Sequence, residues 1–245
     1  AYYSSSKEDK QKLDKFRTEI EPHLKDIEDP EKISKFSNQI LKGVHLLRSI
    51  KTPQTLKPLR EFAVDKAAET FSNLALNSYK KFKDSAPIIS VENPPSGSGF
   101  SRSEDLRQIM EKSREKFVQK AQEEGMSKSE AQKQAEKLIG VTWDVGHINM
   151  MKKYGYDDTH LLKETEKVAP YVKHIHLSDN FGLEHTELPM GMGNVPLKGH
   201  LAKLQKQYGD KLKKIKQIVE AGNWYQHFKT TPFKETLSAF NSPVY

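Results

Sequence analysis

The sequence contains no cysteine among its 245 residues, and it contains no long uninterrupted apolar run. The first absence excludes a disulfide framework and any metal site built on thiolates. It is compatible with a reducing compartment, and we expect the cytoplasm. The second absence excludes a transmembrane helix, which needs roughly 20 consecutive apolar residues. Residues 1–6 also lack the basic and apolar regions of a signal peptide. We therefore expect no membrane partner.

The chain is basic, with 40 Lys and Arg against 33 Asp and Glu and a formal net charge of +7. Such a surplus favours anionic partners such as phosphates or nucleic acid. The basic residues, however, alternate with acidic ones along predicted helices, as in the segment 111–116, and they form no single stripe with interleaved aromatic residues. A lysine-rich solubilising surface is the simpler interpretation, and nucleic acid stays open as an alternative.

Residues 1–85 are predicted to form a helical segment. Apolar residues recur at helical spacing in three stretches, at 9–27, 30–47 and 59–82. Pro30 stands in the first turn of the second stretch, where proline is well tolerated. We find no strong strand pattern in this segment, which we interpret as an enlarged crossover between strands.

Residues 86–245 follow a different pattern, in which short apolar runs alternate with helical stretches. Two capping-box signals, at residues 101–104 and 127–130, each precede a helical stretch. Alternation of strand and helix indicates parallel strands joined by crossover connections. Nearly continuous apolar runs fit strands that are covered on both faces. The sequence thus predicts an α/β fold with strands at 88–92, 139–144, 172–177 and 215–220.

Each predicted strand ends in a carboxylate or an imidazole that is followed by a turn. These residues, Glu92, Asp144, His176 and Glu220, are called the quartet below. In an α/β barrel the carboxyl ends of the strands converge on one mouth. Three carboxylates there would repel one another without a divalent cation. Oxygen ligands with one imidazole suit Zn, Mn, Mg or Co. We predict a site for one to three such ions, and an acidic rim paired with Lys or Arg is the alternative.

Four other residues extend this predicted site. His147 follows the second strand end closely and is a candidate metal ligand or substrate donor. His185 and Glu187 stand two residues apart, so in extended chain they point to one side and could bind a second ion. A polar solvent loop is an equally good interpretation of that pair. Asp179 is a candidate acceptor that orients a neighbouring ligand.

Over about residues 86–240, the ordered motifs resemble those of the xylose isomerase-like TIM barrel superfamily. That superfamily includes sugar isomerases and epimerases, and also the endonuclease IV type of apurinic endonuclease, AP endonuclease family 2. The resemblance implies a (β/α)8 TIM-type barrel with its chemistry at the mouth. The motifs that carry it are Val91-Glu92-Asn93, Asp144-x-Gly146-His147, His176-Leu177-Ser178-Asp179-Asn180, Gly191-x-Gly193-Asn194-Val195-Pro196 and Val219-Glu220-Ala221-Gly222.

By this resemblance, the quartet is the metal set of the isomerase and epimerase branch, in which the two glutamates are also the catalytic acid/base pair. His147 matches a substrate-binding histidine in that branch and a metal ligand in the endonuclease branch. The endonuclease branch has an Asp-x-His metal pair before the Gly-x-Gly turn, where this chain has His185-x-Glu187. The ligand types are kept but their order differs, which counts against an endonuclease.

The barrel implied by the resemblance is incomplete in this sequence. A complete barrel has eight strands, whereas only four are clear here, with residues 242–245 as a further candidate. An open half-barrel would expose strand edges and apolar surface. We therefore predict that another polypeptide, or an N-terminal part absent from this sequence, supplies the first strands.

Three functions fit these observations. The leading prediction is a divalent-metal-dependent isomerase or epimerase that acts on a small sugar or sugar phosphate. The second is a phosphodiester hydrolase of the endonuclease IV type that acts on abasic DNA with two or three metal ions. The third is a non-catalytic structural or assembly subunit, with the charged helices predicted at 7–83 and 101–138 as its interaction surfaces.

Overall fold

A computed structural model describes residues 2, 5–50, 56–222 and 224–243. The chain divides into two compact units, Ala1–Pro58 and Leu59–Tyr245. Within the parts of the chain that the structure describes, no helix combines the length and apolarity needed to cross a membrane.

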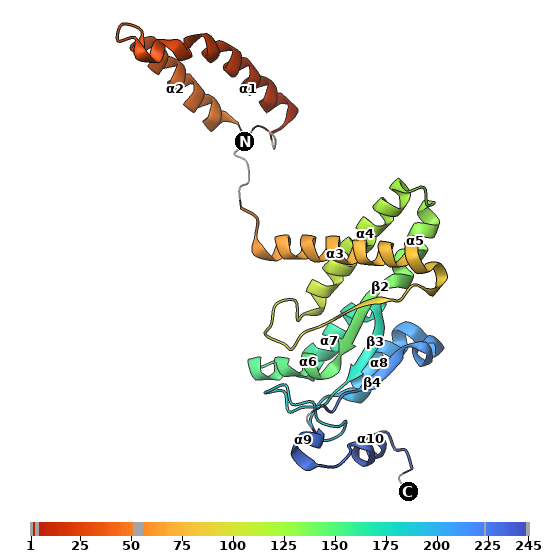
Figure 1. Cartoon of the computed structure of the whole chain (residues 1–245). Helices are drawn as coiled ribbons and strands as arrows, with labels where there is room; N and C mark the ends of the chain where they lie inside the picture. Colours follow the sequence, from red (N-terminus) through yellow and green to blue (C-terminus); the bar gives the residue numbers. More distant parts are fainter. Residues whose placement is uncertain (1, 3–4, 51–55, 223, 244–245) are drawn as a thin grey trace. The chain divides into compact units, whose positions relative to one another are not determined.

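The first unit is a pair of helices, α1 (Lys7–Ile20) and α2 (Ile33–Ser49), joined by the 3₁₀ helix η2 (Glu21–Glu28) (Figure 1). Helix α1 begins after Ser6, whose hydroxyl accepts the backbone N–H of Asp9, as expected for an N-cap. Much of the apolar stripe predicted on α2 is exposed in the described structure. Its exposed members are Ile33, Ile40, Leu41, Val44 and Leu47.

The second unit contains a four-stranded sheet of parallel strands in the order β1-β2-β3-β4. The α/β class and the four predicted strands are thus confirmed, and no barrel is formed by the described residues. Their bounds are Ile89–Glu92 for β1, Ile139–Asp144 for β2, Val172–Leu177 for β3 and Lys216–Val219 for β4. Residues 242 and 243 are not in a strand, and 244 and 245 lie outside the described residues.

Helices connect the strands, as the alternation of patterns predicted (Figure 1). Helix α3 was predicted within the helical segment 1–85, but it belongs to the same compact unit as the sheet. The helices are α3 (Leu59–Phe82), η3 (Lys83–Ser85), α4 (Ser103–Glu123), α5 (Lys128–Leu138), α6 (Val145–Asn149), η4 (Met150–Tyr154), α7 (Asp158–Val168), η5 (Ala169–Tyr171), α8 (Leu197–Tyr208), η6 (Gly209–Lys214), α9 (Trp224–Phe228) and α10 (Phe233–Ala239).

The two predicted capping boxes have different outcomes. Ser127 caps α5, because its hydroxyl accepts the backbone N–H of Glu130 at 3.2 Å. Ser101 does not cap α4, which begins two residues later at Ser103. The backbone N–H and the hydroxyl of Ser103 instead donate to the buried carboxylate of Glu164 on α7, at 2.9 and 2.7 Å. A tertiary contact therefore replaces the local cap.

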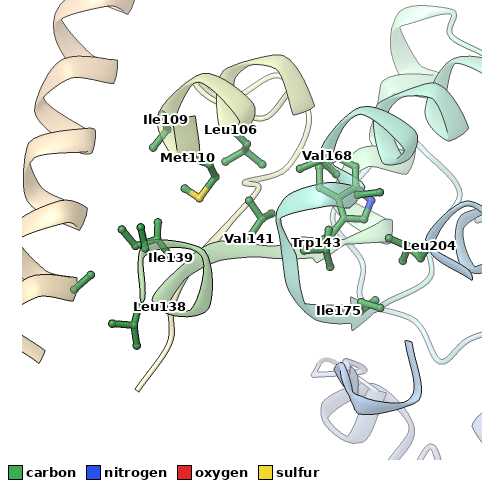
Figure 2. Packing of buried hydrophobic residues seen from close by; sticks show 14 of the residues in the cluster. Leu106, Ile109, Met110, Leu138, Ile139, Val141, Trp143, Val168, Ile175 and Leu204 are labelled. Carbon is green, nitrogen blue, oxygen red and sulfur yellow. The ribbon is translucent and has the colours of Figure 1, made fainter. Parts of the chain in front are cut away.

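The core lies between the sheet and the helices on one of its faces. Figure 2 shows Trp143 of β2 beside Val168, Ile175 and Leu204, which come from α7, β3 and α8. Burial of these large apolar side chains stabilises the packing by roughly 25 cal/mol per Å² of apolar surface removed from water. The order of the strands and this core fix the direction in which the strand ends point.

A buried chain of hydrogen bonds ties β2 to two of these helices. The indole N–H of Trp143 donates to the hydroxyl oxygen of Thr165 on α7 at 2.9 Å. The Thr165 hydroxyl lies 2.6 Å from Nδ1 of His200 on α8, to which it donates its proton. All three side chains are fully buried. Burial lowers the pKa of His200 to about 4, so the ring is neutral and can accept this bond.

An irregularity in the pairing of β2 with β3 decides which side chains of β3 share a face with Asp144. Val141 pairs with Val172, but Thr142 pairs with His174, so Lys173 is an extra residue on β3. The shift brings His176 opposite Asp144. Gly140 makes room for the extra residue, because a Cβ there would lie against the Lys173 side chain and 2.8 Å from the Tyr171 carbonyl oxygen.

The face of the sheet that carries the quartet is polar below it. Ser90 and Thr142 share a hydrogen bond of 2.7 Å between their hydroxyls. The His174 ring lies 4.8 Å from that of His176, measured between centroids, and its Nε2 is buried without a hydrogen-bond partner among the described residues. β1 and β4 are the edge strands of this sheet. Among the described residues, neither edge strand pairs with a further strand on its outer side.

Candidate metal centre

The quartet lies at the carboxyl ends of the four parallel strands. Glu92 and Asp144 are the last residues of β1 and β2, and His176 is the penultimate residue of β3. Glu220 directly follows β4, and its backbone N–H donates to the Leu177 carbonyl at 2.9 Å. One ligand atom from each quartet residue lies within 4.8 Å of the others. The predicted convergence of these four side chains is thus confirmed, and the cluster could hold a metal ion.

Asp144 is the most constrained member of the quartet. Its Oδ1 accepts the backbone N–H groups of Gly146 and His147 at 2.7 and 2.8 Å, and the Ser178 hydroxyl at 3.0 Å. Its Oδ2 is buried and has no hydrogen-bond partner among the described residues. A buried carboxylate oxygen without a partner is costly. A cation bound among the quartet would remove that cost, so the residues fit a metal site.

His176 lies between the two glutamates. Its Nδ1 is 3.0 Å from Glu92 Oε1 and 3.0 Å from Glu220 Oε1. Burial raises the pKa of Glu220, the contact with His176 opposes this, and the nearby Asp144 carboxylate raises it further. Burial and the neighbouring carboxylate therefore disfavour the negative charge of Glu220, which a divalent cation would compensate.

Asn93 braces the first two strand ends, a role that the sequence did not suggest. Its amide Nδ2 donates to the Asp144 carbonyl at 3.0 Å, and its Oδ1 accepts the Asp144 backbone N–H at 2.8 Å. Its own carbonyl oxygen lies 2.6 Å from Nδ1 of His147. The side chain is completely buried. In the sequence, Asn93 stood out only as the last residue of the Val91-Glu92-Asn93 motif, which assigned it no role of its own.

His147 points its second ring nitrogen toward the quartet. A carbonyl oxygen can only accept, so Nδ1 of His147 carries the proton that it donates to Asn93. In the neutral ring, Nε2 is then an acceptor. This Nε2 lies 3.8 Å from Asp144 Oδ2 and 2.7 Å from Nε2 of His185. The 2.7 Å contact makes His185 the donor to this lone pair, so a metal or a substrate hydroxyl would reach His147 Nε2 by taking the place of His185.

His185 and Glu187 lie together near the quartet, although the chain is not extended at Glu187, whose φ is 34°. Nε2 of His185 is 3.5 Å from Glu187 Oε1. Glu187 also approaches the turn after Glu220, because a Cβ on Gly222 would lie 2.5 Å from its Oε2. These two residues and His147 form a second group of nitrogen and oxygen donors next to the four clustered ligands.

Asp179 has a different role from the predicted one of orienting a neighbouring ligand. Its Oδ1 accepts the backbone N–H groups of Asn180 and Val195 at 2.9 and 3.0 Å, and its Oδ2 accepts that of Gly191 at 2.9 Å. Both oxygens are thus used to hold the Gly191-x-Gly193 turn against the end of β3. Asp179 shapes the loop that borders the site.

One hollow adjoins the quartet, and a second lies beside His185. One, of about 560 Å³, is lined by Glu187, Glu220 and the α10 residues Phe233 and Thr236, among others. The other, of about 430 Å³, lies between the 185–188 loop and α9. Helix α9 was not predicted from the sequence.

Comparison of the chain with protein family models, with curated proteins and with solved structures found no match.

Proposed function

We propose that this chain carries the metal site of a divalent-metal-dependent enzyme resembling sugar and sugar phosphate isomerases and epimerases. The observation that supports this most is the quartet itself. Four ligand atoms gather within 4.8 Å at the ends of adjacent parallel strands, and Oδ2 of Asp144 is buried among them without a partner. Ligands at the carboxyl ends of parallel strands are in the position where barrel enzymes place their chemistry.

We infer that further strands complete the sheet as a TIM-type barrel. Three features support this: the open edges of β1 and β4, the polar face beneath the quartet, and the buried, unpartnered Nε2 of His174 on that face. Unpaired strand edges invite pairing with other strands. Native mass spectrometry and gel filtration of purified material would test the inference. A monodisperse single chain of 28.1 kDa that melts cooperatively would count against it.

Glu92, Asp144, His176 and Glu220 would hold the ion, with Mn, Mg, Zn or Co as the suitable metals for three carboxylates and one imidazole. When bound, such an ion would polarise a substrate carbonyl or hydroxyl and so acidify the adjacent C–H group. A substrate hydroxyl that takes the place of His185 would donate to His147 Nε2 at the edge of the site.

The two glutamates are the proposed acid/base pair. Each places one carboxylate oxygen 3.0 Å from the same nitrogen of His176, so they flank a common position. Both side chains are partly exposed, Glu92 at 38% and Glu220 at 30%. One carboxylate oxygen would take the proton from the hydroxyl-bearing carbon next to the carbonyl, which leaves an enediolate. The same or the opposite glutamate would return a proton to the former carbonyl carbon, while the hydroxyl proton passes to the former carbonyl oxygen.

Metal content of the purified chain tests the site directly. Asp144→Asn keeps an oxygen that can accept the Gly146 and His147 N–H groups but removes the charge. We expect it to bind Mn or Zn about tenfold or more weakly than the unaltered chain. Asp210→Asn is the matched control, because the Asp210 side chain is 96% exposed and remote from the quartet. Stoichiometric metal retained in both Asp144→Asn and Glu220→Gln would exclude the quartet as the site.

The reaction is tested by exchange of solvent deuterium into a sugar. Metal-supplemented protein would be incubated with D-fructose, D-xylulose or their phosphates in deuterated water. Exchange at the carbon beside the carbonyl is expected, together with its loss in Glu92→Gln and Glu220→Gln. A chain with stoichiometric metal and no exchange on any of these sugars would favour a different reaction.

A phosphodiester hydrolase acting on abasic DNA is the second candidate. It is favoured by the additional donors His147 and His185, whose Nε2 atoms are 2.7 Å apart, with Glu187 beside them. Such a group could supply ligands for a second ion. Tight binding to duplex DNA containing an abasic site, with affinity that falls steeply as salt rises, would support this candidate over the isomerase. His185→Ala should then lower the metal content without emptying the quartet.

A further inference from the structure

The hollow between the 185–188 loop and α9 has an aromatic wall next to the metal centre. It measures about 430 Å³ and lies within the size range of small-molecule sites. Trp224 and Phe228 form the wall on α9, with their ring centroids 4.3 Å apart and their planes 32° from parallel. Its lining is His185, Thr186, Leu188, Trp224, His227 and Phe228.

One residue of the aromatic wall is buried and hydrogen-bonded, and the other is exposed to solvent. Trp224 is buried, and its indole N–H donates to the Thr230 hydroxyl at 3.2 Å. Phe228 is 55% exposed although its ring lies against that of Trp224. A fixed indole under an exposed phenyl ring is a surface on which a flat ring can stack.

His185 joins this hollow to the metal centre. It lines the hollow, and its Nε2 lies 2.7 Å from that of His147, which in turn lies 3.8 Å from Asp144 Oδ2. A molecule whose reacting end lies at the quartet can therefore reach the aromatic wall past two side chains. No Asp, Glu, Lys or Arg lines the hollow among the described residues.

We propose that this hollow is a subsite for an uncharged, planar aromatic ring carried by the substrate. The inference rests on the proposed function, because it takes the quartet as the place where the sugar end of the substrate reacts. The absence of charged side chains in the lining disfavours a phosphate or carboxylate in this position. A ring that is stacked there would contribute binding energy remote from the reacting carbons, which an enzyme can use to orient them. Nucleosides and aryl glycosides both carry such a ring on a sugar.

Saturation-transfer NMR on the full chain tests the subsite without requiring turnover. The ring-bearing probes are adenosine and phenyl β-D-glucoside, and the matched probes without a ring are D-ribose and methyl β-D-glucoside. We expect saturation of the ring protons above that of the sugar protons, and tighter binding of the ring-bearing member of each pair. The pair that shows the larger difference distinguishes a nucleobase from an aryl group.

Phe228→Ala is the diagnostic variant, because its side chain is half exposed and its loss should leave the fold intact. We expect it to weaken the binding of ring-bearing probes roughly tenfold, as removal of a stacking side chain does elsewhere. Phe82→Ala, at an exposed phenylalanine on α3 that lines neither of the two hollows, is the control and should change nothing. Equal affinity for probes with and without a ring, or equal effects of the two variants, would overturn the subsite.

The measurements are repeated in Glu220→Gln, which separates this inference from the proposed metal chemistry. Ring selectivity that persists in Glu220→Gln and is lost in Phe228→Ala supports the subsite, whatever the metal analysis shows. Stoichiometric metal in the quartet with no ring selectivity would leave the proposed function standing and refute the subsite.

Discussion

The buried chain from Trp143 through Thr165 to His200 allows a sharp test of how the second unit is held together. The Thr165 hydroxyl accepts from the Trp143 indole at 2.9 Å and donates to His200 Nδ1 at 2.6 Å. Trp143 directly precedes Asp144, so this chain also fixes the strand end that carries a proposed metal ligand. Thr165→Val keeps the shape of the side chain and removes both hydrogen bonds.

The expected cost follows from the groups left behind. In Thr165→Val the indole N–H and the imidazole nitrogen both stay buried without a partner, and each such group costs about 1–3 kcal/mol. The added methyl group returns about 0.8 kcal/mol. We expect a net loss of about 3 kcal/mol in the free energy of unfolding. At roughly 2–4 °C per kcal/mol for a domain of this size, the melting temperature should fall by roughly 6–12 °C.

Urea and thermal unfolding followed by circular dichroism would measure this loss. Thr159→Val, at an exposed threonine on the same helix, is the control and should stay within about 0.5 kcal/mol of the unaltered chain. Thr165→Ser keeps the hydroxyl and loses only a methyl group, so it should cost about 1 kcal/mol. Equal losses in Thr165→Val and Thr165→Ser would show that packing, and not the hydrogen bonds, is responsible.

Three further changes have expected outcomes. The pKa of His200 lies near 4 in the folded chain and at 6.5 in the unfolded chain. The contribution of neutral His200 to the free energy of unfolding is therefore fully present above about pH 6.5 and falls by about 3 kcal/mol as the pH drops toward 4. Urea midpoints across this pH range should show the fall, and His200→Gln should flatten the dependence of the midpoint on pH. Burial raises the pKa of Glu164, but hydrogen bonds from Arg102 and Ser103 outweigh this and hold the pKa at about 2. Glu164→Gln should therefore lower the free energy of unfolding in denaturant by about 2 kcal/mol. A loss no larger than that of the exposed Glu166→Gln would argue against a stabilising role for these buried hydrogen bonds. Gly140→Ala should lower metal affinity, measured by calorimetry, because the added methyl group displaces β3 from its register; unchanged affinity would contradict that reading.

The strands and the quartet could be predicted because both depend on local sequence. A covered parallel strand is a short apolar run, and the ligand that ends each run is followed by a turn, so Glu92 and Asp144 stood out. Parallel pairing then brings the strand ends together without any knowledge of the loops.

The supporting contacts could not be predicted, because they depend on tertiary neighbours. Asn93 was only the last residue of a motif, yet its side chain bridges two strand ends. Ser101 had the sequence of a cap, but Glu164 from another helix draws the start of α4 to Ser103. Asp179 was expected to orient a ligand, and the backbone of the 191–195 turn occupies its carboxylate instead. In each case the partner is far away in the chain.

The extra residue in β3 sets the phase of the whole strand relative to the site. Side chains alternate between the two faces of a sheet, so a single unpaired residue exchanges the two sets. If Lys173 paired with Thr142 instead of bulging out, Ile175 would stand opposite Asp144, and the imidazole of His176 would turn into the helix-covered core. The bulge at Lys173 thus determines whether β3 places the His176 imidazole or the Ile175 side chain at the site. Insertions and deletions in the loops leave this phase untouched, whereas regular pairing of Lys173 would remove the His176 ligand from the site while leaving every quartet residue in the sequence.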